Sequence, residues 1–77
     1  MPPYRISLVN QDFTSTTESE LDEIEQVRTQ ALKGALQIGT DEICSGQPFF
    51  AAEIIIEDNR ERVERMLVSV GKSSLKS

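Results

Sequence analysis

The residues that could do chemistry are few, and they do not form a catalytic arrangement. The chain has no histidine and a single cysteine, Cys44. Histidine is the commonest general base near neutral pH, and a thiol needs a neighbouring base or positive charge to become a nucleophile. A zinc site would lack its usual nitrogen and sulfur ligands. We therefore expect no enzymatic activity, no catalytic residues, no bound metal and no cofactor.

Two groups of polar residues have simple structural explanations. The acidic pair at 22–23 lies where a helix is predicted to begin, and the pair at 57–58 lies where a turn follows a strand. The hydroxyl-rich segment 14–19 (TSTTES) offers groups for phosphorylation or ligand binding. A solvated connector or a short strand explains the same composition without a ligand.

Arg28 is a basic residue within a mostly apolar helical face, and it has two interpretations. Its stem can pack on the sheet while the guanidinium reaches outward to pair with Glu53 or Glu57. Alternatively, it anchors an anion at an interface. A small-molecule or anion-binding regulatory domain is therefore our second hypothesis for function.

The element that positions these residues is one long amphipathic helix predicted over 22–44. Asp22 and Glu25 have the spacing of a capping box, and Gly46 followed by Pro48 predicts the end of the helix. The helix either lies deeply buried on its own sheet, or packs one stripe on that sheet and another on a second copy. The apolar side chains form two adjacent stripes (Ile24, Val27, Ala31, Ala35 and Ile38; Leu32, Leu36 and Ile43).

Two glycines, Gly34 and Gly39, lie inside this helix, where each is less favourable than alanine by about 1 kcal/mol. They predict a bend or the close approach of another backbone. A break at Gly39 is the alternative.

Alternating polarity predicts the strands. Residues 4–9 form a strand with one buried face, and segment 14–19 either pairs back on it as a hairpin or is a mobile loop. Strands at 52–57 and 62–70 follow the helix, joined by a tight turn in which Asn59 can adopt a left-handed conformation. The fold class is α+β: one long helix on a small, mainly antiparallel sheet of three to four strands. The pattern does not define the strand order.

The small size of the chain favours self-association. Its 77 residues form one domain, predicted over 1–70, with a polar tail at 71–77 that we expect to be disordered. A domain of this size buries only about 60% of its unfolded surface. One cysteine rules out an internal disulfide, so oligomerisation is the remaining support, and we expect a homodimer.

Charge and hydropathy limit the partners and the compartment. The formal net charge of −5 disfavours nucleic acid and anionic membrane surfaces as partners. No segment approaches the roughly 20 apolar residues of a membrane span, and the N-terminal residues lack the apolar run of a signal peptide. The unpaired Cys44 fits a reducing compartment. We expect a cytoplasmic protein.

The order of these features resembles a known family. The chain begins its first strand at Pro3-Tyr4, continues with ELDEIEQVR at 20–28, and has an acidic turn at 58–60 between its last strands. Over residues 4–70 it is similar to a family of short, uncharacterised proteins of rhizobia and related alphaproteobacteria, known only as a domain of unknown function. That family usually has glycine in the last turn. The resemblance implies a bacterial, cytoplasmic origin and this topology, but no activity and no site residues.

The first hypothesis for function is a small protein–protein interaction or structural module that self-associates and binds a further, unidentified protein. The adjacent rings at 49–50 either close the end of the core or form an exposed patch. The outer face of the sheet offers a second apolar surface among charges. Seven residues are candidates for the interface: Arg28, Leu32, Leu36, Phe49, Phe50, Ile55 and Leu67.

Overall fold

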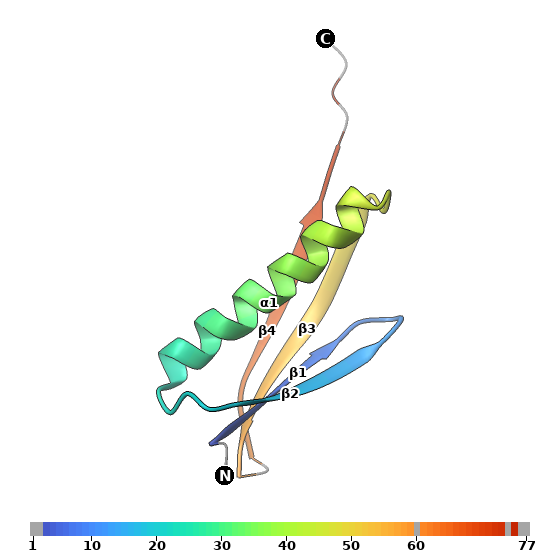
Figure 1. Cartoon of the computed structure of the whole chain (residues 1–77). Coiled ribbons are helices and arrows are strands. Elements are labelled where there is room, and N and C mark those ends of the chain that lie inside the picture. The colour runs from blue at the N-terminus through green and yellow to red at the C-terminus, as the bar shows by residue number, and fades with distance from the viewer. Residues whose placement is uncertain (1–2, 60, 74, 76–77) are drawn as a thin grey trace.

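The computed structural model describes residues 3–59, 61–73 and 75. Its elements are β1 (Tyr4–Val9), β2 (Thr14–Ser19), α1 (Ile24–Cys44), β3 (Phe49–Asp58) and β4 (Glu61–Gly71). The strands form one antiparallel sheet in the order β2-β1-β3-β4, and α1 packs on one of its faces (Figure 1). The predicted α+β class is confirmed, and the segment 14–19 is a strand.

Two predicted segments, the C-terminal tail and the last turn, contain residues outside the described ranges. Gly71 ends β4 and so does not belong to the predicted tail at 71–77. Residues 74, 76 and 77 of that tail lie outside the described residues, as does Arg60 of the predicted turn. Asn59 in the same turn has a positive φ of 49°, which confirms its left-handed conformation.

The helix connects two parallel strands that are not neighbours. Because β1 is antiparallel to both β2 and β3, β2 and β3 run in the same direction on either side of it. The connection through α1 therefore joins β2 to β3, with β1 between them in the sheet.

The hairpin of β1 and β2 is closed by Asn10. Its Oδ1 accepts hydrogen bonds from the backbone N–H groups of Asp12 (2.7 Å) and Phe13 (3.1 Å). Its own N–H donates to the Phe13 carbonyl at 2.9 Å. An asparagine that binds the backbone two residues on makes a turn without glycine. This turn sets the register, which runs from Tyr4 opposite Ser19 to Val9 opposite Thr14.

The start of α1 differs from the prediction. The N-cap is Glu23, in extended conformation and without a side-chain cap hydrogen bond, so the capping box of Asp22 and Glu25 is wrong. The first intrahelical bond runs from the Val27 N–H to the Glu23 carbonyl at 3.0 Å, which places Asp22 outside the first turn. The helix continues to Cys44 without a break, and Gly46 follows with a φ of +117°, as predicted.

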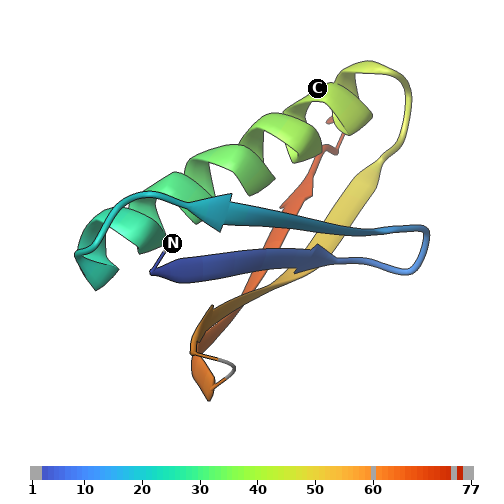
Figure 2. The same ribbon diagram turned by 60° about the horizontal axis from the view of Figure 1, so that its bottom comes forward.

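Strands β3 and β4 are longer than predicted, and β3 is about as long as the helix. A helix of 21 residues is about 32 Å long, and a strand of ten residues is about 33 Å long. The register extends to Phe49 opposite Gly71, which no alternation of polarity near residue 49 indicates. The helix lies over β3 and β4, while the β1–β2 hairpin extends away from it (Figure 2).

The core is a single layer between α1 and the inner face of the sheet. Gly39 brings the helix close to that face, because a Cβ there would lie 3.0 Å from Phe50 Cδ2 and 3.1 Å from Val70 Cγ2. Gly34 has no such neighbour within 4 Å, so the predicted close approach holds only at Gly39. The buried apolar residues are Leu8, Val27, Ala31, Ala35, Phe50, Ala52, Ile54, Ile56 and Val68.

Candidate functional site

The structure distributes the seven candidate interface residues over three places. Phe50 is buried in the core at 4% exposure, so its ring cannot itself contact a partner. Three candidates lie on the outer face of the sheet, and the other three lie on the side of α1 that overhangs β4. The first group is Phe49, Ile55 and Leu67; the second is Arg28, Leu32 and Leu36.

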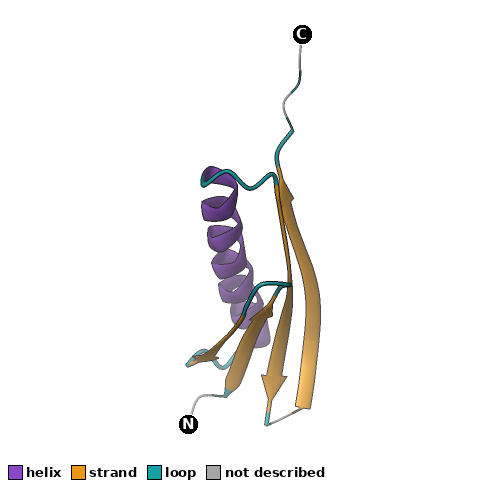
Figure 3. Ribbon diagram, turned by 90° about the vertical axis from the view of Figure 1, so that its right-hand side faces the viewer, coloured by secondary structure: helices purple, strands orange, loops and turns teal. Residues whose placement is uncertain are grey.

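The outer face of the sheet carries apolar side chains among ion pairs. No described part of the chain covers this face (Figure 3). Phe49 is 62% exposed and Leu67 is 78% exposed. An ion pair between Arg65 and Glu53 separates Leu67 from Ile55. The face is therefore mixed in character, as is common for an antiparallel sheet with one solvated side.

Arg28 pairs with Glu64 of β4 rather than with Glu53 or Glu57. Both predicted partners alternate with isoleucines that are buried under the helix, so they point to the opposite face. The hydrogen bond to Glu64 raises the pKa of the Arg28 guanidinium, with smaller contributions from the charges of Glu64 and Glu25 and an opposing one from burial. This guanidinium already has a carboxylate partner, so the anion-binding interpretation loses its main support.

Leu32 and Leu36 form an apolar flank on α1 next to Arg28. Positions four apart lie on the same side of a helix, so both leucines follow Arg28 along the side that faces the β4 edge. Leu32 is partly buried against the core, while Leu36 is 46% exposed. The flank is therefore a continuation of the core that remains accessible.

The edge of β4 presents unpaired backbone groups. Strand β4 pairs with β3 on one side and with no described strand on the other. The Lys72 N–H donates to the Pro48 carbonyl at 3.1 Å and so continues the β3–β4 register. Because backbone direction alternates along a strand, the even-numbered residues from 66 to 72 face β3. The N–H and C=O groups of Leu67, Ser69 and Gly71 consequently point outward.

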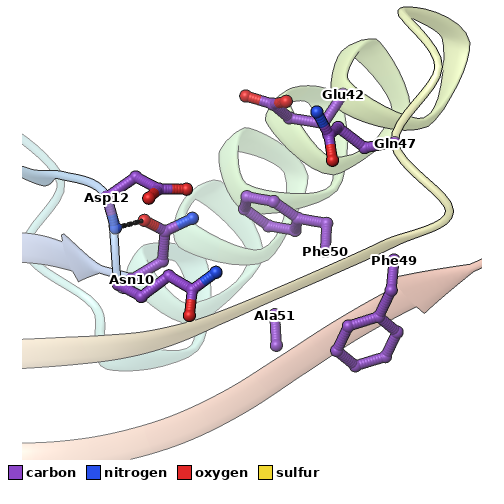
Figure 4. Close-up of a pocket in the computed structure, with 8 residues that line it drawn as sticks. Asn10, Asp12, Glu42, Gln47, Phe49, Phe50 and Ala51 are labelled. Carbon is purple, nitrogen blue, oxygen red and sulfur yellow. Dashed lines mark hydrogen bonds between the residues drawn. The ribbon is translucent and has the colours of Figure 1, made fainter.

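A pocket of about 380 Å³ lies between the β1–β2 turn and the end of α1 (Figure 4). Asp12 and Glu42 contribute carboxylates, and the Phe50 ring points toward α1 whereas Phe49 points to the other side of β3. The Asn10 side chain is already engaged in the turn. The lining has no histidine, cysteine, serine or threonine, and the described residues contain no group of three or more potential metal ligands. Asp12 and Glu42 are the only titratable side chains among the lining residues.

A second hollow, a groove of about 200 Å³, runs between α1 and the β1–β2 hairpin. Its walls are mostly apolar, and Gly34 keeps it open because no side chain fills the space beside the helix. At one end Gln30 is held by Ser19, whose hydroxyl donates to Oε1 at 2.6 Å. The groove is lined by Ile6, Leu8, Ser15, Thr17, Gln30, Ala31, Gly34, Ala35 and Ile38.

Comparison with protein-family models, with curated proteins and with solved structures returns no match. The family resemblance seen in the residues therefore stays a prediction. Within the described part of the chain, no helix has the length and apolar character needed to cross a membrane.

Sequence reasoning missed the open edge of β4, because which strand lies at an edge depends on the strand order. The charge pattern alone does not reveal it. Residues 66–70 (MLVSV) carry no charge, whereas residues 61–65 (ERVER) carry four. Exposed edge strands are normally protected by charged residues or proline, so an uncharged half-strand by itself indicates a paired strand.

Proposed function

We propose that the chain is a small, self-associating interaction module of the bacterial cytoplasm, and that its basic unit is a homodimer. The observation that carries this proposal is the exposure of large apolar side chains on a thin fold. Leu36, Phe49 and Leu67 are 46%, 62% and 78% exposed. Side chains of this size on a domain that buries so little core favour association.

Two further features support the cytoplasmic placement and the non-enzymatic role. Cys44 is exposed and unpaired, which fits a reducing compartment. The pocket between the β1–β2 turn and the end of α1 offers carboxylates and carboxamides with no histidine, cysteine, serine or threonine beside them. The resemblance to a bacterial family of unknown function agrees with this placement.

The test of the proposal is the native mass by light scattering across a dilution series. We expect about twice the monomer mass of 8.6 kDa at micromolar concentration, with dissociation on dilution. A mass of one monomer at every concentration would contradict the proposal.

A second candidate function, small-molecule binding, is favoured by the open groove beside Gly34. The ligand would be small and apolar, because the walls are mostly aliphatic and the polar groups lie at the rim. A thermal-shift screen with short fatty acids and aromatic compounds tests this, since a ligand at 100 times its Kd stabilises by about 2.7 kcal/mol. The variant Gly34→Leu, which fills the groove, should abolish any shift. Equal shifts in both proteins would rule the groove out.

A further inference from the structure

We infer that a second copy of the chain docks on the open edge of β4, so that two four-stranded sheets continue as one antiparallel sheet. Both α1 helices then lie side by side on the same face. This inference rests on the proposed self-association and specifies the surface that forms it. It is argued from the backbone of β4, from the charges along that strand and from the flank of α1.

The backbone of β4 is a better edge for pairing than that of β2. The outward groups of Leu67, Ser69 and Gly71 have no partner among the described strands. Natural edges are usually blunted by charge, proline or short length, but β4 has 11 residues and none of these features between 66 and 70. Strand β2 is protected, because it has only six residues and they are all polar.

The charges of β4 select the register of the pairing. With a two-fold axis at Val68, the uncharged stretch 66–70 pairs with itself. The next residues outward on the inner face are then Glu64 of one copy and Lys72 of the other, which are opposite in charge. An axis at Arg65 or at Glu64 would place like charges directly opposite each other. In the Val68 register, each residue whose backbone N–H and C=O point outward lies opposite such a residue of the other copy. Antiparallel hydrogen bonding requires this arrangement.

The helix flank lies at the same level as this axis. Arg28 is paired with Glu64, and Gly39 lies against Val70, so α1 and β4 run side by side in the same direction. Leu36 lies between these two points, about level with the centre of the uncharged stretch. A second copy related by the axis therefore brings its own Leu36 toward this one.

This arrangement buries the exposed part of the helix as well as the strand edge. Leu36 is 46% exposed in the single chain, and Leu32 beside it already packs against the core. Neighbouring helices on a continuous sheet need apolar side chains on their facing sides. The same edge of the molecule therefore offers a second copy both backbone hydrogen-bonding groups and apolar side chains.

The first test compares two substitutions at Leu67, whose N–H points outward while its side chain lies on the outer sheet face. Leu67→Pro removes the outward N–H and leaves the hydrogen bonds to β3 intact. Leu67→Thr keeps the N–H and removes the apolar side chain. Edge pairing predicts that light scattering gives a monomer mass for Leu67→Pro and a dimer mass for Leu67→Thr. Monomers from both variants would assign the dimer to the outer face and overturn the inference.

The second test does not depend on how proline affects the fold. Leu36→Glu places a charge on the exposed flank of α1, and we expect it to raise the dimer dissociation constant at least tenfold. Gln37→Glu is the matched control, because it adds the same charge at the next residue, which is also exposed. This variant should leave the mass unchanged. If the unmodified chain is a dimer and Leu36→Glu remains equally dimeric, this inference fails while the proposed function stands. If the unmodified chain is a monomer throughout, both fail.

Discussion

The two glycines inside α1 differ in their surroundings, and that difference predicts opposite effects of the same substitution. At Gly39 a Cβ would lie 3.0 Å from the ring of Phe50, which is buried in the core, and 3.1 Å from Val70, which is partly buried. A Cβ at Gly34 would have no heavy atom within 4 Å apart from the helix's own nearby backbone. We expect Gly34→Ala to raise the free energy of unfolding by about 1 kcal/mol. We expect Gly39→Ala to lower it, because overpacking costs about 1–3 kcal/mol and exceeds the helix gain.

Urea unfolding followed by circular dichroism, at one fixed protein concentration, measures both values. Each variant serves as the control for the other, since the change in helix propensity is the same. Equal stabilisation by both substitutions would mean that the Phe50 ring and Val70 move aside without loss. The contact at Gly39 would then not determine how closely α1 approaches β3.

At the scale of elements, the joint between β2 and α1 depends on one buried hydroxyl. Ser19 is fully buried, donates to Gln30 Oε1 at 2.6 Å, and accepts from the Leu21 N–H at 3.3 Å. We expect Ser19→Ala to lower the free energy of unfolding by about 1–2 kcal/mol, because it removes a buried hydroxyl that makes both bonds. Ser15→Ala, on the same strand but exposed, should change it by less than about 0.5 kcal/mol.

A double-mutant cycle separates the two bonds of Ser19. If the Gln30 bond matters, Ser19→Ala and Gln30→Ala together should destabilise less than the sum of the single changes, by roughly 0.5–1 kcal/mol. Additive effects would assign the contribution of Ser19 to Leu21 and to packing. The angle between the hairpin and the helix would then be independent of Gln30.

The sequence predicts a helix or strand correctly where its polarity pattern is regular. It fails where the ends of an element depend on pairing with another strand. β1 is correct to the residue because Tyr4–Leu8 alternates in polarity and a turn follows Val9, and α1 is correct at Cys44 because Gly46 follows it. The start of α1 and the ends of β3 depend on tertiary contacts such as Phe49 opposite Gly71, which have no local signal. Arg28 was expected to pair with Glu53 or Glu57 of β3, but both point away from the helix, and the partner is Glu64 of β4.

The same limit applies to the candidate surface. The accessible flank of α1 follows from the apolar arc, which is wider than one sheet can cover. That Phe50 is buried while Phe49 is exposed follows only from the register of β3. The open edge of β4 requires the strand order and the hydrogen bond of Lys72, so no reading of side chains alone would have found it.

At the scale of the whole molecule, association and stability are linked. In the part of the chain that the structure describes, the fold has one core layer, an uncovered sheet face and an open edge, so a second copy adds core that a single chain lacks. When only the dimer is well folded, unfolding and dissociation become one equilibrium. Apparent stability then depends on protein concentration, which it does not for a stable monomer.

We therefore expect the urea midpoint of the unmodified chain to fall on dilution. Each tenfold dilution removes about 1.4 kcal/mol per mole of dimer, which is roughly 0.5 M in midpoint for the urea dependence of a small dimer. Leu36→Glu should unfold at a lower midpoint that no longer depends on concentration, because its exposed flank carries a charge that the second copy cannot accommodate. A midpoint of the unmodified chain that stays constant over a roughly hundredfold range would show that one copy supports its own fold. The exposed leucine and the β4 edge would then be free to bind a different protein.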